Sequence, residues 1–276
     1  MRILDICCCS GGASMGLYQA CRKTGIEPYV CGADIRKPDS YPFEFIQSDI
    51  RELSLDFIRS FDFVWLSPPC QAYSLACVGS SKEYPDLVPF ARNLMYRAGV
   101  PYCMENVPQA PLRRDLLLCG EMFDLGVIRH RHFEISGFEV PQPFHKMHSG
   151  RVIDGEKVTV AGNGFGGSGK IEDWQKAIGI DWITDRWSLA QAVPPVYSQY
   201  IMSCFLGEPD YSLLVDDLPV SSDGWYYQQE MIQCGKPNCK CQRGELHGPY
   251  WMRYKQIGKR RVKQYVGKSY VFSCAH

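Results

Sequence analysis

The sequence lacks several features that would assign a class at once. It has no apolar run of the roughly 18 residues that a membrane helix needs, and its start (Met1–Asp5) lacks the apolar stretch of a secretory signal. We therefore expect a cytoplasmic protein without a membrane partner. With 45% hydrophobic and 22% charged residues, the composition also excludes collagen-like and wholly disordered chains.

The sequence also lacks a net charge, because 30 Lys and Arg residues balance 30 Asp and Glu residues. That balance hides two opposite asymmetries. Residues 225–276 carry ten basic residues against two acidic ones, a net charge of +8, which leaves −8 for residues 1–224. Such a split predicts a basic appendage on an acidic body. On charge alone, the appendage is either a surface for an anionic polymer or a solvated face.

Cysteine is plentiful, but its distribution is unlike that of a secreted disulfide scaffold, which is short and rich in cysteine throughout. The 14 cysteines of this chain of 276 residues gather at Cys7–Cys9 and at Cys234–Cys241, and others lie inside apolar runs. A thiol in an apolar run behaves as a small hydrophobic residue. This distribution favours a reducing compartment.

Short apolar runs alternate with amphipathic segments through the first two-thirds of the chain. The predicted strands are 2–7, 28–33, 43–47, 62–66, 101–104, 116–119 and 132–136, and the predicted helices include 14–23, 53–60 and 87–98. This alternation predicts an α/β fold with a doubly wound, mainly parallel sheet. Ligands of such sheets bind at the carboxyl ends of the strands.

Ligand-binding residue types follow the first three predicted strands. Cys9–Gly16 is a turn of small residues that leads into a helix, where free backbone N–H groups are available to a ligand. Asp34 ends the second strand and Asp49 follows the third. An acidic residue about twenty positions past a glycine turn is suited to ribose hydroxyls. Together these features predict a nucleoside-containing cofactor.

A cysteine and a glutamate follow the next two strands. Pro68 and Pro69 stiffen the loop that presents Cys70, which makes this thiol a candidate nucleophile, although a buried structural cysteine is the commoner case. Glu105 ends the fifth strand. A thiol and a carboxyl group on neighbouring strand ends lie close enough to flank one small substrate ring.

The order of these motifs resembles that of the cytosine-C5 DNA methyltransferases over residues 1–207. Asp5–Gly12 is similar to the opening S-adenosylmethionine loop of that family, Pro68–Gln71 to its nucleophile loop and Glu105–Val107 to its catalytic carboxylate motif. Arg129–Phe133 is similar to the Gln-x-Arg-x-Arg segment, and Ala192–Tyr197 to the last motif. The resemblance implies the Rossmann-like fold of S-adenosylmethionine-dependent methyltransferases.

The resemblance also implies a mechanism. The Cys70 thiolate attacks C6 of cytosine, Glu105 hydrogen-bonds or protonates N3, and Arg131, with Arg129, binds the base or lowers the pKa of the thiol. C5 then takes the methyl group of S-adenosyl-L-methionine. A cytosine in duplex DNA must be flipped out to reach Cys70. The cofactor positions implied by the family match are Cys7, Ser10, Gly11, Gly12, Asp34, Ile35, Asp49, Ile50, Pro69, Tyr197 and Ser198.

Two departures from the family pattern bear on the substrate. The segment in the place of the target-recognition domain, about residues 138–185, is much shorter than in the family. The family also has an aromatic residue in the place of Cys7 and a glycine in the place of Cys9. The short insert leaves little room for base-edge contacts, so single-stranded nucleic acid, RNA or a free cytidine nucleotide is the alternative substrate. A catalytically silent DNA-binding regulator is the non-enzymatic alternative.

The C-terminal part follows an acidic linker, residues 208–224. Cys234, Cys239, Cys241 and His247 are a suitable ligand set for a structural zinc ion, the alternatives being a redox-labile thiol cluster and metal-free buried cysteines. Residues 250–267 alternate aromatic or apolar with basic residues, which predicts a β-hairpin with a cationic face. Residues 225–276 thus resemble small Cys/His-Gly-Pro-Tyr modules of bacterial and mobile-element proteins, here expected to add phosphate contacts to duplex DNA.

Overall fold

The computed structural model describes most of the chain. The described residues are 1–74, 83–143, 145, 148, 157–160, 169–215, 225–232, 234, 236, 239–243, 247–257 and 260–268. The chain divides into an N-terminal unit, Met1–Val140 with Ser149–Val215, and a C-terminal unit, Pro141–His148 with Asp216–His276.

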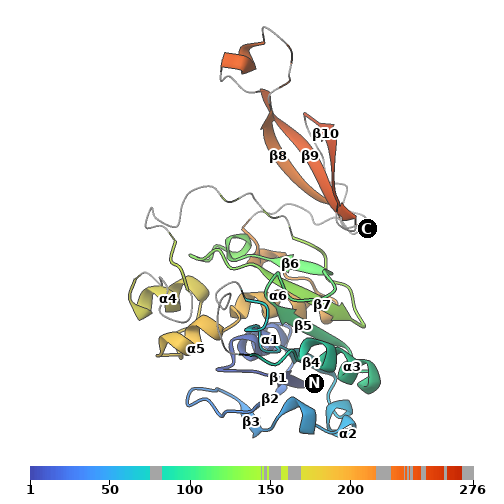
Figure 1. Cartoon of the computed structure of the whole chain (residues 1–276), viewed down its shortest axis with the longest axis vertical. Coiled ribbons are helices and arrows are strands. Elements are labelled where there is room, and N and C mark those ends of the chain that lie inside the picture. The colour runs from blue at the N-terminus through green and yellow to red at the C-terminus, as the bar shows by residue number, and fades with distance from the viewer. Residues whose placement is uncertain are drawn as a thin grey trace. The chain divides into compact units, whose positions relative to one another are not determined.

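The N-terminal unit is built on a seven-stranded sheet with the order β3-β2-β1-β4-β5-β7-β6 (Figure 1). Its strands are β1 (Arg2–Ile6), β2 (Tyr29–Asp34), β3 (Glu44–Gln47), β4 (Phe63–Leu66), β5 (Tyr102–Asn106), β6 (Leu116–Leu118) and β7 (Arg131–Ser136). The first five are parallel, and β7 runs antiparallel to both β5 and β6. The predicted doubly wound, mainly parallel fold is confirmed.

Helices cover both faces of this sheet. The helices of the unit are α1 (Gly12–Lys23), α2 (Leu55–Arg59), α3 (Val88–Ala98), α4 (Ile171–Ile178), α5 (Arg186–Gln191) and α6 (Pro195–Phe205), with short 3-10 turns η1 (Ile50–Glu52), η3 (Gly120–Phe123) and η5 (Tyr211–Leu213). Successive strand residues point to opposite faces. Ile3 and Trp65 therefore pack in one core cluster with α1 and α6, whereas Leu4 and Leu66 pack in another with α3.

Two glycines let α1 approach α6 closely. A Cβ on Gly16 would lie 1.8 Å from the carbonyl oxygen of Pro195, and one on Gly12 would lie 2.3 Å from that of Val193. Ser198 Oγ donates a hydrogen bond across the same contact to the Ala13 carbonyl at 2.7 Å. The glycine turn is thus fixed against the last helix of the unit.

A smaller apolar cluster holds α4 and α5 together, with Trp174, Ile178 and Leu189 at its centre. Trp182, in the loop between these helices, donates from Nε1 to the Ser10 carbonyl at 2.9 Å. Helix α4 and the loop after it form the C-terminal end of the predicted insert, residues 138–185. Most of the insert's middle, residues 149–156 and 161–168, lies outside the described residues.

The N-terminal unit continues past the predicted boundary at residue 207. Lys23 Nζ lies 2.6 Å from Asp210 Oδ2, and the Val215 N–H donates to the Met122 carbonyl at 2.9 Å. Residues 208–215, the first half of the predicted linker, are therefore packed on the unit. Its second half, residues 216–224, lies outside the described residues.

The C-terminal unit contains a three-stranded antiparallel sheet with the order β10-β9-β8. Its strands are β8 (Tyr226–Ile232), β9 (His247–Ile257) and β10 (Arg260–Gly267), with the 3-10 turn η6 (Lys240–Arg243) between β8 and β9. The small β-rich part predicted for the C-terminal end of the chain is thus present. Among the helices in the described part of the chain, none is long and apolar enough to span a membrane.

Candidate active site

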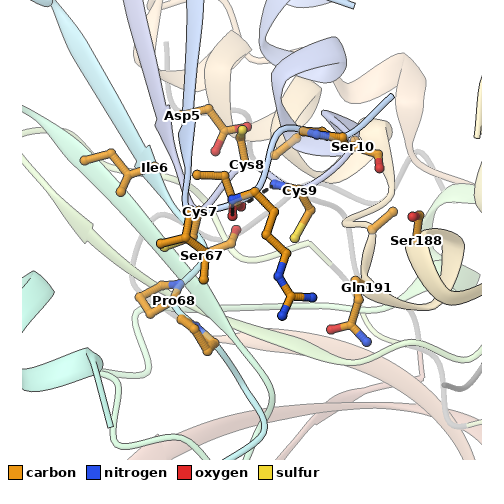
Figure 2. Close-up of a pocket in the computed structure, with 18 of the residues that line it drawn as sticks. Asp5, Ile6, Cys7, Cys8, Cys9, Ser10, Ser67, Pro68, Ser188 and Gln191 are labelled. Atoms are coloured by element: carbon orange, nitrogen blue, oxygen red, sulfur yellow. Dashed lines mark hydrogen bonds between the residues drawn. The ribbon is translucent and has the colours of Figure 1, made fainter. Parts of the chain in front are cut away.

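A cavity of about 850 Å³ opens at the carboxyl ends of β1, β2, β4 and β5 (Figure 2). The structure brings three of the four predicted catalytic residues to it, namely Cys70, Glu105 and Arg131. Eight of the eleven predicted cofactor residues also line it: Cys7, Ser10, Gly12, Asp34, Ile35, Asp49, Ile50 and Pro69. Residues distant in sequence therefore share one cavity, as expected for the edge of a parallel sheet.

The turn after β1 has an unusual backbone. Cys7, Cys9 and Gly11 all have positive φ, at 59°, 45° and 81°. Only glycine adopts this region without a steric cost, which explains the glycine found in the family at the place of Cys9. The Cys9 N–H donates to Asp34 Oδ2 at 3.0 Å, and this bond helps to hold the turn against β2.

The two predicted cofactor carboxylates differ in their surroundings. Besides its bond from Cys9, Asp34 accepts a hydrogen bond from the Arg36 N–H at 3.3 Å. Asp49 forms a two-point ion pair with Arg51, with Nε at 2.9 Å from Oδ1 and Nη2 at 2.5 Å from Oδ2. The hydrogen bonds from Arg51 lower the pKa of Asp49 to about 2, so this carboxylate is charged at neutral pH.

Asp5 is a buried cavity residue that the sequence reasoning did not single out. Ser14 Oγ donates to its Oδ2 at 2.5 Å, whereas Oδ1 has no hydrogen-bond partner in the part of the chain that the structure describes. Burial raises the pKa of Asp5 to about 7. Its position near the end of β1, four residues before the small-residue turn Cys9–Gly16, was the available signal.

The predicted nucleophile lies in a turn at the other side of the cavity. The N–H groups of Tyr73 and Ser74 donate to the Cys70 carbonyl at 3.0 and 2.9 Å, and Asn106 Nδ2 donates to the Pro68 carbonyl at 2.9 Å. These bonds fix the loop to β5. Burial raises the pKa of the Cys70 thiol, and the positive charge of Arg131 opposes that rise.

Glu105 and Arg131 form an ion pair on neighbouring strands. Arg131 Nε lies 2.6 Å from Glu105 Oε1, and the two side chains are only 14% and 8% exposed. In the β5–β7 ladder Glu105 faces Phe133, so Arg131 lies on the same face of the sheet, two residues along β7. The pair places a fixed carboxylate and a guanidinium at one end of the cavity.

The remaining predicted site residues lie outside the described cavity lining. Arg129 is buried, and its guanidinium donates to three backbone carbonyls, Val160 at 3.1 Å, Ala190 at 2.6 Å and Ala192 at 3.1 Å. Burial lowers its pKa to about 9. Tyr197 OH donates to the Arg129 carbonyl at 2.7 Å. Arg129, Tyr197 and Ser198 thus make hydrogen bonds that join neighbouring parts of the unit. The predicted direct contacts of these three residues and of Gly11 remain untested.

One wall of the cavity was missed by the sequence reasoning. Trp187, Ser188 and Gln191 on α5 line it, and Trp187 is 53% exposed. Figure 2 shows Ser188 and Gln191 beside the same space as Cys9 and Ser10. Helical spacing in the sequence could have indicated this wall, because it places these three residues on the side of α5 opposite the buried Leu189.

The four predicted metal ligands of the C-terminal unit do come together. Their ligand atoms all lie within 4.8 Å of one another. Cys234 Sγ is 3.5 Å from Cys241 Sγ, and Cys239 Sγ is 2.9 Å from His247 Nε2. Ligands on a zinc tetrahedron with Zn–S bonds of about 2.3 Å lie roughly 3–4 Å apart. The donor set and its spacing therefore fit a zinc ion.

Comparison with solved structures agrees with the fold of the N-terminal unit. The Entamoeba histolytica methyltransferase EhMeth matches with a TM-score of 0.52 and 13% identity, over 75% of this chain and 98% of that one. This likeness shows a shared fold. A mutant of Spodoptera frugiperda DNMT2 matches with a TM-score of 0.36 and 19% identity, over 48% of each chain. Schizosaccharomyces pombe Dnmt2 matches with a TM-score of 0.36 and 19% identity, over 49% of this chain and 50% of that one.

The alignments thus span about half the length of the two Dnmt2 chains. Residues 210–271 match a family model, DUF6788, described as a domain of unknown function. No similar protein was found among curated proteins.

Proposed function

We propose that the N-terminal unit transfers a methyl group from S-adenosyl-L-methionine to C5 of a cytosine in DNA. The observation that carries the proposal is the Arg131–Glu105 ion pair at one end of a cavity that also holds Cys70. A thiol, a carboxylate and a guanidinium around one small space are the groups that an attack on the cytosine ring requires.

Cys70, Glu105 and Arg131 have different roles in the proposed reaction. Cys70, as a thiolate, forms a bond to C6, and the ring then carries extra negative charge. Glu105 hydrogen-bonds or protonates N3, and Arg131 both orients Glu105 and favours the thiolate. When bound, S-adenosylmethionine would supply the methyl group to C5 and would leave as the neutral thioether S-adenosylhomocysteine. Loss of the C5 proton to solvent, as the C6–S bond breaks, would then release Cys70 as a thiolate. A cytosine in duplex DNA enters this cavity only after it leaves the stack.

The cavity fits the nucleoside part of the proposed methyl donor. Asp34 and Asp49 offer carboxylates for ribose hydroxyls and amino groups, and Ile35 and Ile50 offer apolar contacts for a base. Oδ1 of Asp5, which has no hydrogen-bond partner among the described residues, offers a buried acceptor in the same cavity. When bound, S-adenosylmethionine supplies an electrophilic methyl group, and these residues serve to hold and orient it.

The test is methyl transfer from radiolabelled S-adenosylmethionine to duplex DNA, single-stranded DNA, transfer RNA and dCMP in parallel. We expect label in DNA that is lost in Cys70→Ala and kept in Cys204→Ala, which changes a thiol of α6 outside the cavity lining. Label confined to transfer RNA or dCMP would keep the chemistry and replace the substrate. Transfer to none of the four, with binding of DNA intact, would favour the silent regulator.

We also propose that Cys234, Cys239, Cys241 and His247 hold a structural zinc ion. The closeness of the four ligand atoms supports it, as does the small size of the sheet, which has little core of its own. Metal analysis of the purified protein should give about one zinc per chain. A stoichiometry near zero in protein that was never exposed to a chelator would contradict the proposal.

A further inference from the structure

Strand β10 forms one edge of the sheet in the C-terminal unit and carries three consecutive exposed residues, Lys263, Gln264 and Tyr265. Lysines on an edge strand commonly protect it from pairing with other chains. That explanation does not account for Tyr265, which is 59% exposed, because an exposed aromatic ring favours association. The edge therefore combines a charge with an aromatic surface.

The ladder places Lys263 and Tyr265 on one face. Lys263 pairs with Tyr254 and Tyr265 pairs with Met252, and directly opposed residues of antiparallel strands share a face. Tyr254 and Met252 are 4% and 6% exposed, so they form a buried floor. The exposed side chains of Tyr265 and Lys263 thus lie next to buried side chains of β9 on the same face of the sheet.

The rings on this face hold one another in position. The rings of Tyr250 and Tyr265 lie 5.9 Å apart at 79°, an edge-to-face arrangement, and Lys263 Nζ lies 5.5 Å from the Tyr254 ring. A ring held in this way loses little conformational freedom when a ligand stacks on it. The face is therefore preorganised for a flat aromatic ligand next to an anion.

The charge of residues 225–276 indicates the class of the aromatic, anionic ligand. Residues 225–276 carry a net charge of +8, which complements a nucleic-acid backbone. In a duplex the faces of the bases are stacked and closed to a tyrosine ring, whereas in a single strand every base offers its face. We propose that β10 binds single-stranded DNA, with Tyr265 stacked on a base and Lys263 against a neighbouring phosphate.

This surface goes beyond the proposed methyl transfer and does not depend on it. The two are nevertheless compatible, because a cytosine leaves the stack at the lowest cost where DNA is already unpaired. The binding proposal and the methyl-transfer proposal can also be contradicted independently of each other. DNA binding through β10 needs neither S-adenosylmethionine nor Cys70, so Cys70→Ala protein should bind the same strand with the same Kd.

The test is fluorescence anisotropy of the full chain with a labelled oligothymidylate of about 12 nucleotides, a length within the range of known single-strand sites. Tyr265→Ala should raise Kd at least about fivefold, since stacking on one base is worth roughly 1–3 kcal/mol. Tyr265→Phe keeps the ring and should bind as the native chain does. Lys263→Gln should raise Kd and reduce the salt slope by about one.

The matched control is Tyr96→Ala on α3, a tyrosine that is 86% exposed in the N-terminal unit and should leave Kd unchanged. The Kd for a duplex of equal length should not respond to Tyr265→Ala. The proposal is overturned by a Kd that Tyr265→Ala changes less than twofold, by an equal loss of duplex binding, or by tighter binding of an oligouridylate that depends on Tyr265. Circular dichroism spectra and melting temperatures equal to those of the native chain show that the variants fold.

Discussion

Arg131 Nε lies 2.6 Å from Glu105 Oε1, and the same guanidinium opposes the rise that burial gives to the pKa of Cys70. One arginine thus acts on both other members of the proposed catalytic set. Because its positive charge favours the thiolate, removing it should make the thiol harder to ionise. The pair therefore links thiol chemistry to the orientation of the carboxylate.

The first prediction concerns Arg131→Gln. The pKa of Cys70 should rise further, and the rate of alkylation by iodoacetamide at pH 8 should fall about tenfold or more. Methyl transfer should fall by about two orders of magnitude. Mass spectrometry of the Cys70 peptide measures the alkylation against pH, and an unchanged profile would contradict the role assigned to Arg131.

The second prediction separates Arg129 from Arg131. Arg129→Met leaves the carbonyls of Val160, Ala190 and Ala192 without their donor, and should lower the free energy of unfolding by about 3 kcal/mol. Urea unfolding measures this loss. A variant that keeps its stability and loses methyl transfer would return Arg129 to the predicted catalytic role.

The third prediction follows from the pKa of about 7 at buried Asp5. This folded-state value lies above the unfolded value of about 3.9, so the stability it contributes is complete below about pH 4 and is lost as the pH rises through about 7. The loss is on the order of 4 kcal/mol. Asp5→Asn should not show this pH-dependent loss of stability. Urea unfolding at pH 4.5 and pH 8 measures the free energy of unfolding of both proteins. Relative to the native chain, Asp5→Asn should be more stable at pH 8 than at pH 4.5. A difference that is the same at both pH values would be evidence against a raised pKa.

The fourth prediction tests the contact between α1 and α6. A Cβ at Gly16 would meet the Pro195 backbone at 1.8 Å, which no side-chain movement relieves. Gly16→Ala should therefore cost several kcal/mol of stability. Gly126→Ala is the control, because its Cβ would meet Ala177 at an ordinary 3.4 Å. Equal melting temperatures for the two variants would show that the helices separate without cost.

The fifth prediction concerns the metal cluster. Cys239→Ser should abolish zinc binding, whereas Lys236→Gln, an exposed change in the same loop, should retain it. If the proposed zinc ion joins the four ligands, its loss should make the chain between β8 and β9 more sensitive to trypsin. Limited proteolysis with and without chelator measures this, and identical digestion patterns would assign the cysteines no structural role.

The strands of the N-terminal unit could be predicted because their signal is local. Apolar runs such as Phe63–Leu66 lie buried on both faces of a parallel sheet and are bounded by turn residues, so burial and sequence agree. In the C-terminal sheet the alternation predicted the hairpin of β9 and β10, whereas β8 was not predicted. The metal ligands could also be proposed from sequence, since three cysteines and one histidine occur within 14 residues.

Asp5 and Arg129 show where that reasoning stopped. Nothing near Asp5 in the sequence reveals that Ser14 bonds one oxygen and leaves the other without a described partner. Arg129 and Arg131 are two residues apart and chemically identical. Their partners, however, come from residues 160–192 in one case and from Glu105 in the other.

The sequence by itself determined the type of sheet, the order of the motifs and the basic end of the chain, because periodicity, spacing and charge are properties of neighbouring residues. Only the tertiary structure decided which arginine meets Glu105, which carboxylate is buried and which face of β10 carries Tyr265 with Lys263. Those outcomes depend on distances between residues far apart in the chain. Such distances are set when the strands pair and the helices pack.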